Sequence, residues 1–471
     1  MPATPKIQRE GWASAKHRAP VYLILAVVGI AILFDGYDLV IYGAVLSNLL
    51  EDPTQIGALS PQVAGTLGSW AMVGVMVGAL AAGAVGDRLG RRNVFLVAIV
   101  WFSIGMAVTS MAQSIVMFGL LRFLTGLGIG VIVATGGAII AEFAPANRKN
   151  LFNAIVYSGV PAGGVMASLM ALWFQDSWGW RGLFLFGASP LLFLLPLAYV
   201  ALPESPRWLI TRGRHAQATA VCEKYGLPKD SFLFDPSASS TTTATATQAK
   251  SDIEKTGFAG IFSRSYLIGT LLIGAMSFIG LLSTYGLNTW LPKIMQANGA
   301  SPHDSLYSLL VLNGGAVIGG LFVAWVADKI GAKIVITCTF LLAAVMLAIL
   351  PQFNTVTPMY LPIALAGIGV LGTQVLVYGL TSNYFGTAQR AAGVAWTAGF
   401  GRLGGIFGPA IGGLIIGSGA TPSTAFYQFA AVAAVGALCT ALIPRSPVDR
   451  VLDQGPVPAA APEKEPVPVA R

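Results

Sequence analysis

The stretches GAVGDRLGRR (residues 83–92) and AWVADKIGAK (residues 324–333) decide the fold. Each is a short charged turn between two long apolar runs, the first after the second run and the other after the eighth. The same feature therefore occurs at the same place in both halves of the chain, which indicates an internal repeat. Such a repeat predicts two six-span halves that move about a site near the middle of a membrane.

The composition is typical of a membrane protein. Of the 471 residues, 55% are hydrophobic and 10% are charged, whereas a soluble domain carries roughly 25% charged residues. Apolar runs of roughly 20 residues are long enough to cross a bilayer as helices. We therefore predict an all-α membrane protein with twelve transmembrane helices in two pseudo-symmetric six-helix halves. The predicted spans are residues 21–47, 63–86, 93–112, 115–141, 151–174, 182–202, 266–292, 305–327, 334–351, 358–384, 391–416 and 423–443.

Polar segments divide the chain into five parts. These are a tail (1–20), the first half (21–202), a linker (203–265), the second half (266–443) and a second tail (444–471). The linker centre reads SASSTTTATATQAK and has little to bury, so we expect it to be flexible. The last part is rich in Pro, Ala and Glu, and we expect it to be disordered.

The placement of basic residues predicts the orientation. Of the 28 Lys and Arg residues, 24 lie on the side of both termini, two lie on the other side, and Arg122 and Arg402 lie within spans. The positive-inside rule then places both termini in the cytoplasm. This asymmetry explains the net charge of +8 without a nucleic-acid partner. The three cysteines are scattered, so we expect no disulfide framework, metal site or cofactor.

Two carboxylates lie within the first span, in LFDGYDLVIYG (residues 33–43). Asp35 and Asp38 are three residues apart, so they share one helical face, with Tyr42 one turn further along. Because like charges in hydrocarbon repel and are poorly solvated, at least one of them should exchange protons near neutral pH. The alternative is an inert structural pair that Arg122 or Arg402 neutralises.

Arg122 itself needs compensation, because a cation at the bilayer centre costs about 2.5 kcal/mol or more. A carboxylate, a carbonyl or water would supply it, or the side chain would snorkel to the interface. The glycines that follow in RFLTGLGIG (residues 122–130) permit close helix packing.

These turns and spans resemble the major facilitator superfamily. The resemblance rests on both charged turns, on RFLTGLGIG, on AEFAPANR (residues 141–148) and on PESPR (residues 203–207). It implies that charged groups at the cytoplasmic helix ends latch the outward-facing state, while Glu142 at the membrane edge is a further candidate for relaying protons. The implied gating residues are Gly83, Asp87, Arg88, Gly90, Arg91, Asp328, Arg148 and Arg207.

A narrower resemblance is to the aromatic acid:proton symporter family within that superfamily. It rests on DGYD in the first span and on GRLGGIFGPAIGG in the eleventh. It implies a bacterial inner-membrane importer of benzoate, hydroxybenzoates, protocatechuate or gentisate, driven by the proton gradient. In this interpretation Arg402 holds the substrate carboxylate, and aromatic and amide side chains contact the ring. The candidates for substrate binding are Arg122, Arg402, Tyr42, Tyr157, Trp290, Gln374, Tyr378 and Trp396.

Two other classes of protein remain open at this point. One is a carrier of sugars, organic cations or dicarboxylates, and the other is a membrane sensor that binds such a ligand without moving it. An enzyme is disfavoured, because the three histidines lie outside the spans and no nucleophile or phosphate loop accompanies them. We expect a monomer in the bilayer whose partners are the small aromatic carboxylate and protons.

Overall fold

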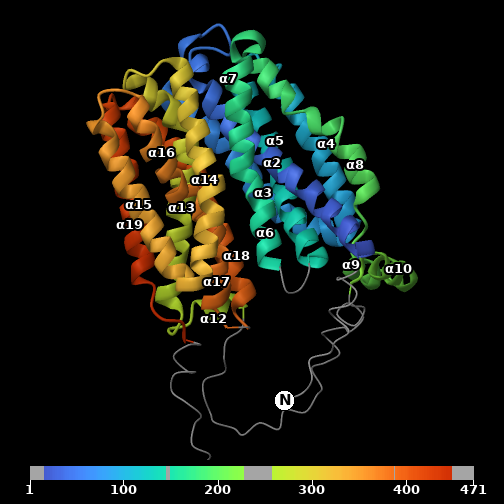
Figure 1. Cartoon of the computed structure of the whole chain (residues 1–471). Coiled ribbons are helices and arrows are strands. Elements are labelled where there is room, and N and C mark those ends of the chain that lie inside the picture. Colours follow the sequence, from blue (N-terminus) through green and yellow to red (C-terminus); the bar gives the residue numbers. More distant parts are fainter. Residues whose placement is uncertain (1–14, 145–148, 228–256, 387, 448–471) are drawn as a thin grey trace, which may run out of the picture.

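The structure is a computed structural model that describes residues 15–144, 149–227, 257–386 and 388–447. All regular elements in these ranges are helical, and eleven helices are long and apolar enough to cross a membrane. They stand roughly parallel in two bundles, one from each half of the chain (Figure 1). The predicted all-α membrane fold with two helical halves is confirmed.

The first half contains α2 (Ala15–Glu51), α3 (Pro61–Leu89), α4 (Arg91–Thr109), α5 (Ile115–Phe143), α6 (Lys149–Tyr157), α7 (Gly159–Phe186), η1 (Ser189–Leu191) and α8 (Leu194–Ala201). The short helices α9 (Pro206–Thr211), α10 (His215–Tyr225) and α12 (Gly257–Ile261) lie at one end of the bundles. The second half contains α13 (Leu267–Ala297), α14 (Pro302–Ile330), α15 (Ala332–Ile349), η3 (Leu350–Gln352), η4 (Thr357–Met359), α16 (Tyr360–Gly367), η5 (Ile368–Gly372), α17 (Gln374–Tyr384), α18 (Arg390–Gly417) and α19 (Pro422–Leu442).

The sixth predicted span is broken, and the sequence did not predict the break. Gly179 lies just before this span, in the predicted connection to the fifth, and turns the chain within α7 with φ 62° and ψ −178°, a conformation that glycine adopts without strain. The chain then continues as the last turns of α7, the short η1 that contains Pro190, and α8. A proline lacks the N–H that a continuous helix needs. Eleven long helices and this broken segment therefore stand where twelve continuous helices were predicted.

The two halves repeat each other at the end that carries α9, α10 and α12, here called the basic end. Gly90 and Gly331 turn the chain between α3 and α4 and between α14 and α15, with φ of 88° and 96°. Arg92 Nε then donates to Leu202 O (2.7 Å), whereas Lys333 Nζ donates to Ile443 O (2.6 Å). Arg92 is separated from Lys333 by the same number of residues as Leu202 is from Ile443. The internal repeat therefore extends to these hydrogen bonds.

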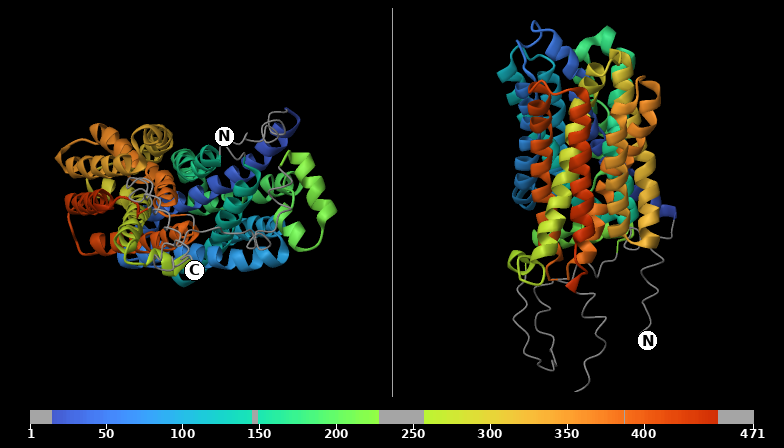
Figure 2. Two further views of the ribbon diagram at one scale, coloured as in Figure 1. Left: turned by 90° about the horizontal axis from the view of Figure 1, so that it is seen from below. Right: turned by 90° about the vertical axis from the view of Figure 1, so that its left-hand side faces the viewer.

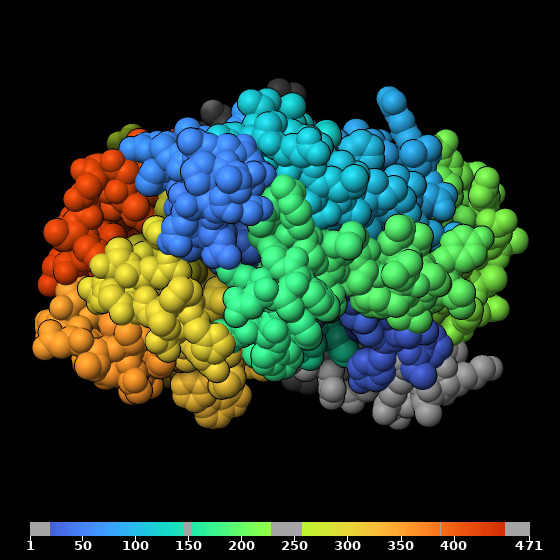
Figure 3. All heavy atoms as spheres, turned by 90° about the horizontal axis from the view of Figure 1, so that it is seen from above, coloured from blue at the N-terminus to red at the C-terminus, as the bar shows by residue number. Residues whose placement is uncertain are grey.

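The halves contact each other at the opposite end, where α3 packs on α18 and α2 packs on α13 (Figures 2 and 3). The backbones approach closely, because a Cβ at Gly43 would clash with the carbonyl oxygen of Asn288. Ser69 Oγ donates to Ile406 O (2.5 Å) and Lys293 pairs with Glu51 (2.8 Å), both between the halves. The structure is therefore closed between the halves at this end.

Replacing Gly43 by alanine should lower the midpoint of thermal unfolding of the detergent-solubilised protein by several degrees. The added methyl group would meet the Asn288 carbonyl, and such overpacking costs about 1–3 kcal/mol. Gly29→Ala on the same helix is the matched control, because a Cβ there meets no atom within 4 Å. Equal midpoints for the two variants would contradict this account of the interface.

Candidate functional site

The two aspartates of α2 have separate surroundings. Asp38 is fully buried and forms an ion pair with Arg122 of α5, within the first half. Asp35 is partly exposed and interacts electrostatically with Arg402 of α18, in the second half. Thus α2 presents one carboxylate to its own half and the other to the opposite half.

The Asp38–Arg122 pair is enclosed by aromatic rings. The Arg122 guanidinium lies 5.3 Å from the centre of the Tyr42 ring and 5.8 Å from that of Phe184. Asp38 Oδ2 and Arg122 Nε make no other hydrogen bond within the described part of the chain. Because so little besides the partner satisfies either charge, each depends on the other.

Asp35 and Arg402 lie in a cluster of tyrosines that both halves contribute, here called the central cluster. The cluster adds Tyr157 from α6 and Tyr285 from α13, which lie within electrostatic range of Asp35 and Arg402, and Tyr378 from α17, which lies within range of both tyrosines. All five side chains are partly exposed or exposed. The cluster is therefore an accessible group of one cation, one carboxylate and three phenol rings.

Tyr285 was missed in the sequence. It lies three residues before Asn288 in α13, so the two share a helical face. The polar Asn288 within this apolar span was a signal that could have led to Tyr285.

Gln374 lies at the start of α17, one turn before Tyr378. Its Nε2 atom is buried and has no hydrogen-bond partner among the described residues. A Cβ at Gly280 of α13 would clash with this amide, so the glycine makes room for it. The preceding π-helical turn Ile368–Gly372 changes the helical register at this point, and such turns are frequent at functional sites.

Three predicted ring contacts have other partners in the structure. The Tyr42 hydroxyl donates to Ala64 O (2.6 Å), and the Trp290 indole donates to Pro409 O (2.8 Å). The Trp396 indole donates to Thr270 O (2.8 Å), and its ring stacks on Phe400. The structure does not bring these three side chains into the central cluster.

Glu142 and the gating residues gather at the basic end. Glu142 pairs with Arg91 (2.8 Å) and lies near Ser205 and Arg207. It is thereby separated from Asp35 and Asp38, with which it was grouped as a proton-coupling candidate. Arg148 lies outside the described residues.

The backbone turn at Gly90 packs directly against the PESPR segment. Glu204 accepts from the backbone amide of Arg92 (3.1 Å), and a Cβ at Gly90 would clash with its carboxylate. The Asp87 carbonyl accepts from the Trp208 indole (3.1 Å) and the Arg88 carbonyl from Arg212 (2.8 Å). The side chains of Asp87, Arg88 and Asp328 are exposed, as is Gly83.

Comparisons with known proteins agree with this architecture. The sequence model of a family described as sugar (and other) transporter matches residues 22–443. The benzoate transport protein of Acinetobacter baylyi is 32% identical over 392 residues, which cover 82% of this chain and 81% of that protein. The gentisate transporter of Corynebacterium glutamicum is 29% identical and covers 88% of this chain and 85% of its own. The gallate transporter of Pseudomonas putida is 30% identical, with coverages of 84% and 86%.

Solved structures show the same fold. A partially occluded inward open conformation of the xylose transporter XylE from E. coli superposes with a TM-score of 0.70, covers 90% of this chain and 100% of its own, and is 18% identical. The crystal structure of a D-xylose-proton symporter gives a TM-score of 0.68 at 19% identity, with coverages of 90% and 98%.

Replacing Arg122 by methionine should destabilise the protein by about 3–5 kcal/mol, because the Asp38 carboxylate would remain buried without its cation. The double variant Asp38→Asn, Arg122→Met should recover much of this loss, since neither charge is then left alone. Thermal unfolding of the purified protein measures both effects. If the double variant loses as much stability as Asp38→Asn and Arg122→Met lose together, the pairing is contradicted.

Proposed function

The chain belongs to the sugar (and other) transporter family, in the aromatic acid branch of the major facilitator superfamily, and we propose that it imports aromatic carboxylates together with protons. It is a transporter and not an enzyme. The observation that carries the proposal is the central cluster, where a cation, a carboxylate and three phenol rings from both halves meet. The relatives named for benzoate, gentisate and gallate support the same substrate class.

The orientation follows from the basic residues. The side rich in Lys and Arg is the cytoplasmic side, which makes the basic end cytoplasmic in a bacterial inner membrane. The contacts between the halves at the opposite end then close the outer side. The arrangement seen is accordingly inward-facing, and alternating access requires those contacts to separate. Because the central cluster is complete within one chain, a monomer suffices.

Arg402 is the group best suited to hold the substrate carboxylate. A guanidinium binds a carboxylate with two parallel charge-assisted hydrogen bonds, and aromatic rings pack offset or edge-to-face. Tyr157 and Tyr285 offer such rings within electrostatic range of Arg402, and Tyr378 adds a third ring beside those two. A small benzoate-like acid carries both a carboxylate for the guanidinium and a ring that packs on the tyrosines.

Asp35 supplies a means of coupling substrate to protons. Its carboxylate and that of the substrate compete for Arg402, because two carboxylates beside one guanidinium leave an excess negative charge. Protonation of Asp35 removes that competition, so the substrate anion binds best when a proton is bound too. One proton with one monoanion moves no net charge, and each further proton adds roughly 2.3 kcal/mol per 100 mV of membrane potential.

Replacing Asp35 by asparagine should abolish accumulation driven by an inward proton gradient but leave substrate exchange across the membrane. The neutral side chain imitates the protonated carboxyl and cannot release a proton. Uptake and counterflow of radiolabelled benzoate, gentisate, gallate and 4-hydroxybenzoate into proteoliposomes measure the two activities. Gradient-driven accumulation by the variant at the wild-type level would refute the role of Asp35, and no uptake of any acid by the wild type would refute the substrate class.

Replacing Arg402 by glutamine should raise the KM for the transported acid at least tenfold, because the charge-assisted bonds to the carboxylate are lost. Arg402→Lys keeps the charge but lacks the planar guanidinium. Its KM should therefore lie between that of the wild type and that of the glutamine variant. The proteoliposome uptake assay gives these values. A carrier of organic cations would tolerate the glutamine, and an unchanged KM would favour that class.

Replacing Gln374 by leucine should reduce uptake of 4-hydroxybenzoate about fivefold relative to uptake of benzoate. The buried Nε2 atom has no hydrogen-bond partner among the described residues, and we assign it as the donor to a ring hydroxyl, which benzoate lacks. One such bond contributes about 1 kcal/mol. The ratio of kcat/KM for the two acids is the measurement. Equal losses for both acids would assign Gln374 to packing instead.

A further inference from the structure

Lys293 and Glu51 form an ion pair that joins the two halves at the outer end, opposite the basic end. Lys293 Nζ donates to Glu51 Oε1 (2.8 Å). Glu51 is the last residue of α2, and Lys293 follows Pro292 near the end of α13. The Lys293 side chain is 26% exposed and that of Glu51 is 63% exposed, so the lysine is the more enclosed of the two.

This pair lies at the outer edge of the contact between α2 and α13 (Figure 3). Further in, the backbone at Gly43 closely approaches the carbonyl of Asn288. Asp35 and Tyr285 of the central cluster belong to the same two helices. Asp35, Gly43 and Glu51 follow one another at intervals of eight residues, and eight residues of helix rise about 12 Å. The contact between α2 and α13 therefore leads from the outer end to the central cluster.

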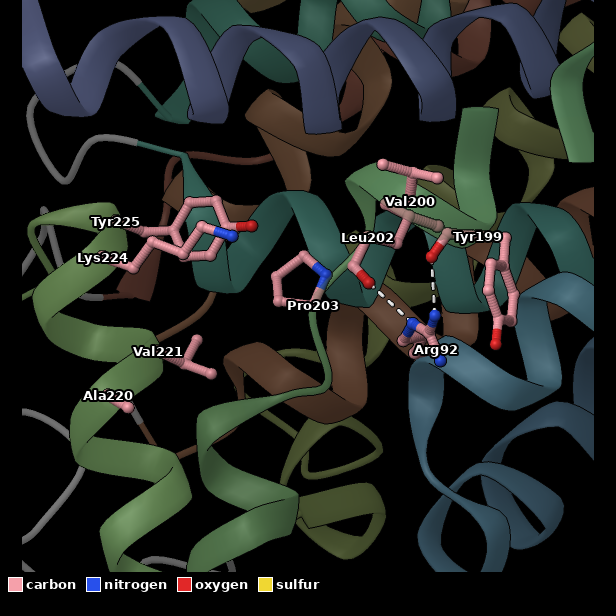
Figure 4. Close-up of a pocket in the computed structure, with 9 residues that line it drawn as sticks. All are labelled: Arg92, Tyr199, Val200, Leu202, Pro203, Ala220, Val221, Lys224 and Tyr225. Carbon is pink, nitrogen blue, oxygen red and sulfur yellow. Dashed lines mark hydrogen bonds between the residues drawn. The ribbon is translucent and has the colours of Figure 1, made fainter. Parts of the chain in front are cut away.

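Other cations of the first half keep their bonds within that half. Arg92 at the basic end donates to backbone carbonyls of its own half (Figure 4). Arg181, the other basic residue at the outer end, also donates to carbonyls of the first half. Lys293 differs, because its partner Glu51 belongs to the opposite half. The proposed alternating access would separate these two side chains whenever the outer side opens.

An opened outer side would thus present the Lys293 ammonium at the entrance to the central cluster. The group that leaves it, the Glu51 carboxylate, is the same chemical group that the substrate carries. An ammonium binds either carboxylate through a charge-assisted hydrogen bond. A substrate anion arriving from outside can therefore replace Glu51, so that the lysine exchanges one carboxylate for another.

We propose that Lys293 is the first binding site for the substrate carboxylate on the outer side, and that Glu51 occupies this site while that side is closed. The inference rests on the proposed function and extends it from the central cluster to the outer surface. An ammonium is a compact point charge without the planar shape of a guanidinium. The site accordingly attracts small carboxylates as a class, whereas selection among rings belongs to the central cluster.

Initial rates of radiolabelled benzoate uptake into right-side-out membrane vesicles test the proposal. Glu51→Gln removes the competing carboxylate and should lower the KM for benzoate about threefold, the contribution of one exposed ion pair. Lys293→Gln removes the cation and should raise the KM about threefold. The difference between wild type and Lys293→Gln should shrink as the ionic strength rises, because salt screens an exposed charge.

The opposite directions distinguish an entry site from a simple latch. If the ion pair only held the outer side closed, both variants would favour opening, and both would lower the KM. A lower or unchanged KM for Lys293→Gln would therefore overturn the proposal. The pair lies at the surface, so both variants should fold, and thermal unfolding checks this. Lys293→Met, which also removes the charge, repeats the test if the glutamine variant does not fold.

Asp176→Asn is the matched control, because it removes one negative charge at an exposed position of α7, near the Gly179 turn, and leaves the ion pair intact. A decrease in KM equal to that of Glu51→Gln would assign the effect to the overall charge of the outer surface and overturn the exchange of carboxylates. Wild type that takes up no aromatic carboxylate would refute the proposed function itself. Normal uptake by wild type, with the same KM in every variant, would refute the entry site alone.

Discussion

The pairing of charge inside an apolar bundle is the constraint on which the arrangement depends. An ion inside a membrane is costly, and removing one partner of a buried pair leaves the other uncompensated. The protein meets this demand in two ways. Asp38 and Arg122 pair within one half, whereas Asp35 and Arg402 face each other between the halves. The proposed alternating access would move the halves as rigid bodies, which would leave the first pair intact and change the second.

Glycine makes the closed contact between the halves possible. At Gly43 and Gly65 a side chain would meet backbone atoms of the other half, so helices approach more closely there than larger residues allow. Pro409 of α18 contributes in another way, because its carbonyl accepts from the Trp290 indole. This bond orders α13 and α18 within the second half, and the ordered α18 then presents Pro409 to α3. An interface of this kind has few side chains to rearrange, which suits surfaces that must separate and rejoin.

The sequence was sufficient to predict the fold and to identify the charged residues within the spans. It was not sufficient to predict which of these residues pair with each other. Helical periodicity placed Asp35 and Asp38 on one face, and both are on α2 as expected. Periodicity does not say which helix lies opposite, so the division of the two aspartates between Arg122 and Arg402 required the three-dimensional packing. Trp290 illustrates the same limit, because an aromatic residue near a polar one gives no sign that its indole binds a backbone carbonyl.

The basic end shows where the two halves have diverged. The bond of Arg92 to Leu202 has its counterpart in that of Lys333 to Ile443, yet the position equivalent to Glu204 is Arg445 and that equivalent to Arg91 is Ala332. The acid that packs on the Gly90 turn and the base that pairs with Glu142 therefore belong to the first half alone. The helices α9 and α10 follow that half, and α10 contributes Lys224 to the same corner. The repeat preserves the backbone turns at the basic end of both halves. The charged residues beside these turns differ, so the first half has interactions there that the second half lacks.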